Sequence, residues 1–116
     1  WNRLASRAVV FENARTPAPI TLTAHASIMT GKNPPEHEAR DNGTWPLTEA
    51  LPTLAERFKE GGWTTGAFIS ASVLDSHYGI GRGFSTYNDH IRPGRDRVVA
   101  HRTGAETVEH AIDWLL

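Results

Sequence analysis

A helix that ends on two glycines and leads directly into a strand sets the strongest limit on how this chain folds. Residues 53–61 predict a helix, because Thr53 can accept a hydrogen bond from the first turn and Glu56 completes a capping box. Gly61-Gly62 ends the helix, and the apolar and β-branched residues of 64–70 indicate a strand. This order is the second half of an α/β unit, so the sequence favours a parallel sheet covered by helices.

The other segments give a coarser map. Leu4 to Arg7 is predicted to close a helix, and the run Ala8–Phe11 is expected to be a buried strand or a turn packed on a sheet. Residues 72–89 show no regular period and are expected to be irregular, and residues 91–97 form a charged loop. Thr103 to Leu116 is the last predicted helix.

Two predicted helices have an apolar stripe that should face the core. The spacing of these residues is that of one helix face, so their burial would hold each helix against the sheet. The expected buried side chains are Leu54, Phe58 and Ala55 in helix 53–61, and Val108, Ile112 and Leu115, widened by Ala111 and Trp114, in helix 103–116.

Residues 16–31 place a hydroxyl side chain where a stiff loop becomes a helix. Pro17 and Pro19 fix their φ angles, so the approach is expected to be extended. A helical pattern begins at Thr21 or Thr23, and Gly31 is a stop signal. Unpaired N–H groups and the helix dipole favour an anion at such a start. The apolar residues of this helix face are Leu22, Ala26 and Met29.

Thr21 and Thr23 each have two interpretations. A threonine at a helix start is typical of an N-cap. It can also be a nucleophile that attacks a phosphate or sulfate resting on the helix N-terminus. His25 follows Thr21 by one turn on the same face, as a polar partner of that site or as a solvated or packed side chain. These residues by themselves do not choose between the two threonines.

A long polar segment, residues 32–46, follows this helix. It contains Asp41-Asn42-Gly43, and Asn-Gly marks a tight turn. A loop of this length between ordered elements is more often functional than idle.

Composition excludes several classes of protein. The 116 residues are 39% hydrophobic, enough for one small domain with a core, and no apolar run reaches the roughly 20 residues of a membrane helix. The net charge of −1 argues against nucleic acid as the main partner. The absence of cysteine excludes disulfides and thiolate metal sites. The loosely clustered arginines Arg92, Arg95, Arg97 and Arg102 are expected to form a solvated face.

Both ends of the chain read as cut. Residues 1–5 resemble the last turns of a helix already under way, and residues 111–116 stop on apolar residues without a stop signal. We therefore expect a piece of a longer protein, with exposed apolar faces and a tendency to self-associate. The compartment of the parent is left open among periplasmic, secreted and membrane-attached.

Several runs, taken together, resemble a known family. T-P-A-P-I-T-L-T-A-H-A-S-I-M-T-G-K-N-P-P-E-H followed by R-D-N-G-T resembles the nucleophile region of the sulfatases and their relatives in the alkaline phosphatase superfamily. The resemblance covers nearly the whole chain in unbroken order. The other similar runs are R-L-A-S-R-A-V-V-F, L-P-T-L-A-E-R-F-K-E-G-G-W-T-T-G-A-F and R-G-F-S-T-Y-N-D.

The resemblance implies a fold and a metal-dependent chemistry. The fold class would be α/β, part of a doubly wound, mostly parallel sheet with flanking helices, here incomplete. Residues 1–116 would be a partial sulfatase-like catalytic domain that lacks the first strand and the C-terminal metal-ligand region. By position, Thr21 matches the nucleophile and would be a metal ligand. A divalent metal (Ca, Mg, Mn or Zn) is expected in the full-length parent and none in the isolated piece.

The sequence departs from the sulfatase pattern at positions that change the expected nucleophile. Sulfatases have Cys or Ser at the nucleophile, then Pro two and Arg four residues on, where this chain has Thr21, Thr23 and His25. Conversion to formylglycine is therefore not open to it, and Thr21 would attack directly to give a threonine ester. The pattern looks more like the nucleotide pyrophosphatase and phosphodiesterase branch, which has a Thr nucleophile and an Asn 21 residues later. Asn42 matches that Asn.

The roles implied for the matched residues follow. The Asn42 amide would donate to charge on the transferred group, although an Asn chosen for the turn before Gly43 is an equal alternative. His25 would be a polar partner. The Lys and His that sulfatases place after the 64–70 strand are missing. His37 matches a family histidine that is usually followed by Gly, but Glu38 follows here. We expect His37 to be structural, holding the loop.

Three functions are consistent with these residues. The leading one is hydrolysis of a small-molecule or glycan sulfate or phosphate ester by the parent protein. The second is a phosphoethanolamine-type transferase of the same superfamily. The third is a non-catalytic binding domain.

Overall fold

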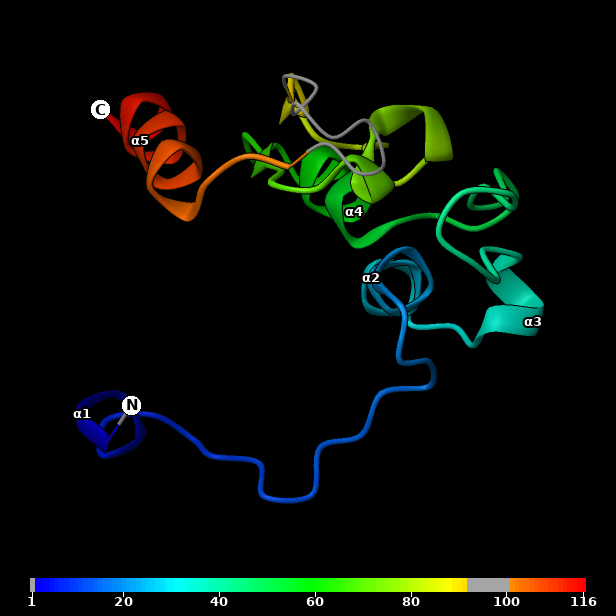
Figure 1. The fold of residues 1–116 in the computed structure, drawn as a ribbon, viewed down its shortest axis with the longest axis horizontal. Helices are drawn as coiled ribbons and strands as arrows, with labels where there is room; N and C mark the ends of the chain where they lie inside the picture. Colours follow the sequence, from blue (N-terminus) through cyan, green and yellow to red (C-terminus); the bar gives the residue numbers. More distant parts are fainter. Residues whose placement is uncertain (1, 92–100) are drawn as a thin grey trace.

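The computed structural model describes residues 2–91 and 101–116, and Figure 1 shows their arrangement. No described helix is long and apolar enough to cross a membrane. The helices are α1 (Asn2–Ala5), α2 (Thr21–Thr30), α3 (Pro34–His37), α4 (Leu54–Glu60) and α5 (Gly104–Leu115), the strands are β1 (Gly66–Phe68) and β2 (Thr86–Asn88), and two short 3₁₀ helices are η1 (Ser72–Leu74) and η2 (Ser76–Tyr78).

The sheet among the described residues is a parallel pair. β1 pairs with β2, with Gly66 opposite Thr86 and Phe68 opposite Asn88. The strand expected within residues 64–70 is therefore confirmed, but β2 lies in the stretch 72–89 that we expected to be irregular. Three residues are too few to show a period of two, and the pairing is set by contacts with β1, about 20 residues earlier in the chain.

Helices cover both faces of this small sheet. The ring of Phe68 lies 6.0 Å from that of Trp114 in α5, on one face. The next residue, Ile69, faces the other side because side chains alternate along extended chain, and it packs on the core formed with α2. Figure 1 shows α5 on one side of the strands and α2 on the other, so the mixed α/β class is confirmed. The buried core residues are Leu22, Ala26, Ala39, Leu47, Leu74 and Ile80.

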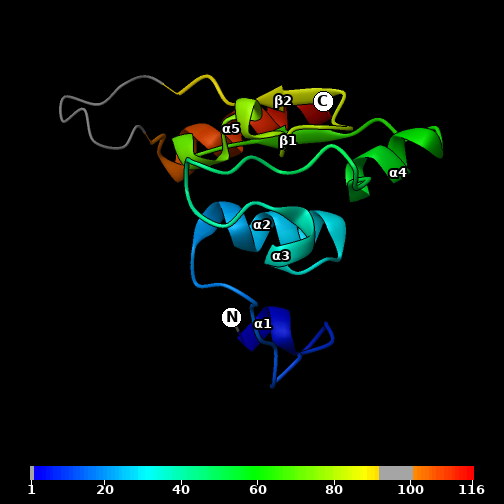
Figure 2. The same cartoon turned by 90° about the vertical axis from the view of Figure 1, so that its right-hand side faces the viewer.

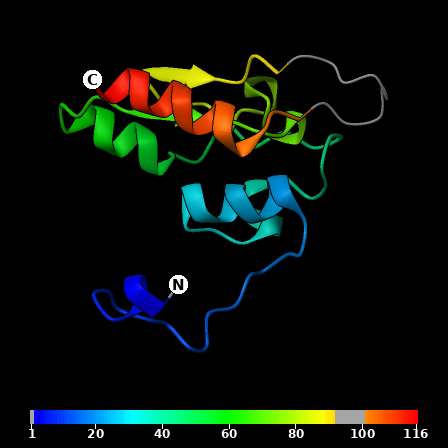
Figure 3. The ribbon, with the colours of Figure 1, turned by 60° about the vertical axis from the view of Figure 1, so that its left-hand side comes forward.

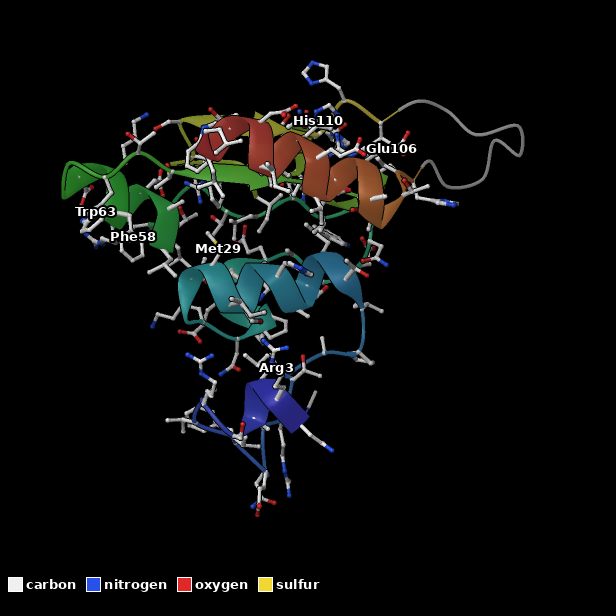
Figure 4. All side chains as sticks on the ribbon, turned by 90° about the vertical axis from the view of Figure 1, so that its left-hand side faces the viewer. Arg3, Met29, Phe58, Trp63, Glu106 and His110 are labelled. Carbon is white, nitrogen blue, oxygen red and sulfur yellow. The ribbon has the colours of Figure 1, made fainter. Side chains whose placement is uncertain are left out.

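Helix α2 presents its apolar stripe to this core as expected. Leu22 and Ala26 are fully buried, and Met29 packs against them. Figure 4 shows Met29 on the side of α2 that faces the layer of the sheet. The helix ends at Gly31, whose φ of 68° is the left-handed conformation predicted for a glycine stop.

Helix α4 begins as the sequence predicts. Thr53 Oγ1 accepts a hydrogen bond from the Glu56 N–H at 3.1 Å, and Glu56 Oε2 accepts one from the Thr53 N–H at 2.7 Å. The hydrogen bond from the Thr53 backbone lowers the pKa of the Glu56 carboxyl. The capping box is confirmed.

The buried face of α4 differs from the prediction. Ala55 is buried, but Leu54 and Phe58 are 48% and 47% exposed. The neighbouring chain approaches the backbone of this helix closely instead: a Cβ on Gly83 would lie 2.1 Å from the Glu56 nitrogen. Because the neighbouring chain meets the helix backbone at this point, the contact uses small residues rather than the long apolar side chains.

The stripe of α5 is also more exposed than predicted. Val108, Ile112 and Leu115 are 56%, 47% and 73% exposed. The helix meets β1 through Trp114, whose ring fills the space above Gly66. An apolar stripe predicts a helix face that can be buried. The two short strands among the described residues are too small to cover this face of α5. Figure 3 shows α5 lying along the outside of the strands.

The segment Ala8–Phe11 is not a strand, so that expectation is wrong for this structure. Val9 and Phe11 are 81% and 79% exposed, and no described strand lies beside them. A β-branched run forms a strand only when a partner supplies the ladder hydrogen bonds. Figure 2 shows α1 and this segment apart from the sheet.

Arg102 is not part of a solvated face. Its Nη1 donates to Asn88 Oδ1 at 2.8 Å, and its Nη2 donates to the carbonyls of Ile69 at 2.6 Å and Asn88 at 3.3 Å. The guanidinium therefore joins the carboxyl ends of β1 and β2. The other three arginines of the expected cluster, Arg92, Arg95 and Arg97, lie outside the described residues, as does most of the loop 91–97.

Candidate active site at the start of helix α2

Helix α2 starts without a side-chain cap of its own. Its N-cap is Ile20, in extended conformation, and it makes no side-chain cap hydrogen bond. Thr21 is the first helical residue and Thr23 the third, so the N-cap interpretation is wrong for both threonines. An isoleucine is among the poorest N-caps, and the helix start therefore needs hydrogen-bond acceptors from elsewhere.

Asn42 supplies one of these acceptors. Its Oδ1 accepts a hydrogen bond from the Leu22 N–H at 2.9 Å. In the part of the chain that the structure describes, the N–H groups of Thr21 and Thr23 have no partner. The helix start thus keeps two N–H donors, close to a polar side chain brought in by the loop.

The contact of Asn42 fixes the direction of its amide. Because Oδ1 accepts from the helix, the Nδ2 group and its two protons point away from that bond and can donate. The turn before Gly43 is made by the preceding residue: Asp41 Oδ1 accepts from the N–H groups of Gly43 and Thr44 at 3.0 and 2.7 Å. These hydrogen bonds from backbone N–H groups lower the pKa of the Asp41 carboxyl, and the one from Thr44 has the larger effect.

His25 lies on the exposed surface one turn from the helix start. Its Nδ1 is 2.8 Å from the Thr21 carbonyl oxygen. A carbonyl only accepts, so Nδ1 carries the proton, and in the neutral ring Nε2 has a free lone pair. The structure therefore brings Thr21, His25 and Asn42 to the same end of α2.

The two threonines differ in accessibility. Thr23 is 1% exposed, and its buried hydroxyl has no hydrogen-bond partner among the described residues. Thr21 is half-buried, and within residues 2–91 and 101–116 its hydroxyl makes no hydrogen bond. The hydroxyl of Thr21 is therefore accessible from solvent, whereas that of Thr23 is not.

The loop that carries Asn42 is tied to α2 by a buried histidine. His37 has no exposed surface, its Nε2 is 2.9 Å from Ser27 Oγ, and its Nδ1 accepts from the Ala39 N–H at 3.2 Å. The expectation that His37 holds the loop is confirmed. Sequence reasoning did not predict the contact of Asn42 with α2. The signal for it in the sequence is that Ile20, which precedes the first residue of α2, is a poor N-cap.

The described residues do not form a metal site by themselves. They contain no group of three or more His, Asp or Glu side chains that could hold an ion. His77, for example, is engaged with Asp75 at 2.7 Å on an exposed surface. Thr21 is thus a single oxygen ligand at most, and any metal would need ligands from residues beyond this set.

Comparison with known proteins yields one distant relative. The chain is 33% identical over 66 residues to a Delta 4,5-hexuronate-2-O-sulfatase of Bacteroides thetaiotaomicron. The matched part is 53% of this chain and 14% of the relative, so the chain spans only a small part of that protein's length. No family model and no solved structure matches the chain. The similarity is partial and distant, and it relates the chain to a sulfatase.

Proposed function

We propose that this chain supplies the nucleophile region of a sulfatase-like ester hydrolase. The observation that carries the proposal is the convergence at the start of α2: an accessible threonine hydroxyl, unpaired N–H groups and the Asn42 amide lie at one helix end. Helix starts of this kind bind oxyanions. The similarity to a sulfatase supports the same reaction class.

In the proposed reaction, the hydroxyl oxygen of Thr21 attacks the sulfur of a sulfate ester. The new bond joins that oxygen to sulfur while the hydroxyl proton is released to water. The bond from sulfur to the ester oxygen breaks, and the substrate alcohol leaves with a proton taken up from water. Water then hydrolyses the threonine sulfate, which releases sulfate and restores the hydroxyl. A phosphate ester would follow the same sequence at phosphorus.

Asn42 and the backbone would stabilise the charge that develops on the transferred group. The Asn42 Nδ2 protons and the N–H group of Thr21 are the accessible donors that the helix leaves open, since Asn42 is exposed and Thr21 is half-buried. Fixed donors of this kind act without reorganising during the reaction. His25 would be a polar partner beside the site, with Nδ1 held by the Thr21 carbonyl and with Nε2 an acceptor in the neutral ring.

The complete sheet, the metal and the substrate are proposed for the parent protein. We propose a doubly wound sheet that continues the β1–β2 pair, with a divalent metal held mainly by residues that the described ranges do not contain. The relative is named for a sulfated hexuronate, so a sulfated sugar acid is the first substrate class to test.

The experiment compares two isosteric substitutions in the complete protein. Thr21→Val and Thr23→Val each remove one hydroxyl and keep the side-chain shape. Hydrolysis of 4-nitrophenyl sulfate, 4-nitrophenyl phosphate and an unsaturated 2-O-sulfated hexuronate is measured. We expect Thr21→Val to lower kcat/KM by at least about 10³-fold, because the nucleophile is lost. Thr23→Val, at a buried hydroxyl without a partner, should keep kcat/KM within about twofold.

Thr21→Ser provides the rescue control, because it keeps a hydroxyl at the same position. Retained hydrolysis in Thr21→Val, or an equal loss in Thr23→Val, would overturn the assignment of the nucleophile. A wild-type protein that cleaves none of these esters would favour the non-catalytic alternative.

A further inference from the structure

The buried imidazole of His37 links α3 and the following loop to α2. His37 is the last residue of α3 and has no exposed surface. One ring nitrogen faces Ser27 on α2, and the other faces the backbone of Ala39, which is also fully buried. The ring therefore has a hydrogen-bond partner on each side.

The two contacts fix the protonation of the ring. The Ala39 N–H can only donate, so Nδ1 must be unprotonated and must accept. In the neutral ring the proton is then on Nε2, which donates to Ser27 Oγ at 2.9 Å. Ser27 Oγ in turn donates to the Thr23 carbonyl at 3.1 Å. A directed chain of hydrogen bonds runs from the loop into the first turns of α2.

The same loop delivers Asn42 to the same helix. Asn42 follows Ala39 by three residues, and its Oδ1 accepts from the Leu22 N–H. The loop is thus attached to α2 at two points, through His37 at Ser27 and through Asn42 at Leu22. Because a helix is rigid over this length, the first attachment limits where the second can lie.

We propose that His37 is a positioning residue that holds the Asn42 amide at the start of α2 through the Ala39–His37–Ser27–Thr23 hydrogen-bond chain. The value of this placement for catalysis rests on the proposed function, but the mechanical link does not. A proton on Nδ1 would replace the acceptor with a donor that faces the Ala39 N–H, and this would detach the loop.

Few charges act on the ring. Ser27 on α2 and Ala39 in the loop contact the ring as neutral groups, and the Thr48 N–H donates to the His37 carbonyl. The charged neighbour is the Glu36 carboxylate on α3, which favours the protonated ring. Lys32 neutralises part of that charge with an ion pair to Glu36 at 3.0 Å.

Hydrogen exchange in the complete protein tests the link directly. His37→Gln keeps an amide near the position of Nε2 but has no acceptor at the position of Nδ1, where the Ala39 N–H donates. His77→Gln is the matched control at an exposed histidine outside the chain of hydrogen bonds. For His37→Gln we expect amide exchange at least about fivefold faster in peptides covering residues 38–46 and the first turn of α2, with α5 unchanged. His77→Gln should leave all of these rates unchanged. Exchange that stays the same in residues 38–46, or that rises equally in α5, would overturn the proposal.

A double-mutant cycle tests whether His37 acts through Asn42. We expect His37→Gln to lower kcat/KM about tenfold in the wild-type protein and less than about twofold in an Asn42→Ala background. Equal losses in both backgrounds would mean that His37 does not act through Asn42 and would overturn the proposal. If the wild-type protein hydrolyses no ester, the proposed function fails, while the exchange experiment still decides the role of His37.

Discussion

At the scale of single residues, Glu38 holds a conformation that suits glycine better. Its φ of 68° is the left-handed region, where a side chain is strained, and it forms the C-cap of α3. The resemblance drawn from the sequence implied Gly at this position, and a φ of 68° is the conformation that glycine adopts without strain. Glu38 itself is exposed.

We expect Glu38→Gly to stabilise the protein by up to about 1 kcal/mol, because the left-handed strain is relieved. Glu38→Ala is the control, because alanine has a Cβ and keeps the strain. Unfolding in urea measures both variants. A gain in Glu38→Ala equal to that in Glu38→Gly would show that the Glu38 side chain, not its backbone, is the cause.

Gly83 allows α4 to approach the chain after η2. Its φ is 87°, and an added Cβ would lie 2.1 Å from the Glu56 nitrogen. Gly62 has a similar φ of 83°, but nothing lies within 4 Å of its Cβ position. Substitutions at the two glycines therefore separate the free-energy cost of a side chain at positive φ from the cost of its steric contact with α4.

We expect Gly83→Ala to destabilise the protein by more than about 3 kcal/mol, because α4 must move away. Gly62→Ala should cost only about 1 kcal/mol from its conformation. Thermal unfolding of both variants gives the comparison. Similar losses at the two positions would contradict the close approach seen at Gly83.

At the scale of elements, the packing of α3 on α2 depends on a neutral histidine. Burial lowers the pKa of His37 below its ordinary value of 6.5. Between the lowered pKa and 6.5 the unfolded chain binds a proton that the folded chain does not. Stability from this residue is therefore complete above 6.5 and is lost as the pH falls towards the lowered pKa.

We expect the free energy of unfolding to fall with decreasing pH below 6.5, by at most about 1.4 kcal/mol per pH unit for this one proton. The pKa of Glu56 is also lowered, but its contribution is lost only below its ordinary value of 4.5, which separates the two windows. Urea unfolding between pH 5 and 7.5 measures the slope. In His37→Gln the free energy of unfolding should depend less steeply on pH. An unchanged slope would show that another group causes the pH dependence.

At the scale of the whole molecule, much apolar surface is left uncovered in the described residues. Phe58 and Trp63 pack edge to face at the far end of α4 but stay 47% and 67% exposed. Val9 and Phe11 lie on the segment between α1 and α2 with little covering them. Figure 4 shows Phe58 and Trp63 together at α4, to the left of the end of α2. Surfaces of this kind bind other apolar surfaces in water.

We expect the 116-residue chain, expressed by itself, to self-associate. Its mass by analytical ultracentrifugation should exceed the 12.8 kDa of one chain and should rise with concentration. Phe11→Ser combined with Trp63→Ser should shift the population towards the monomer. A wild-type chain that stays monomeric at high concentration would show that these faces do not associate.

The sequence by itself determined the features that depend on neighbours along the chain. The capping box of Thr53 and Glu56, the start of α2 near Thr21 and its stop at Gly31 were predictable, because each depends on residues within one or two turns. The small helix-flanked parallel sheet was predictable as a class from the order of helix, glycines and strand.

Tertiary structure alone decided what depends on residues far apart. The pairing of β2, the attachment of Arg102 to Ile69 across 33 residues and that of Asn42 to Leu22 across 20 left no periodic signal. The same holds for burial: Leu54 has an apolar side chain but is 48% exposed, while Gly83 approaches the backbone of α4 at Ala55 and Glu56. Local propensity selects each element, whereas pairing and burial are set by the segments that meet it in space.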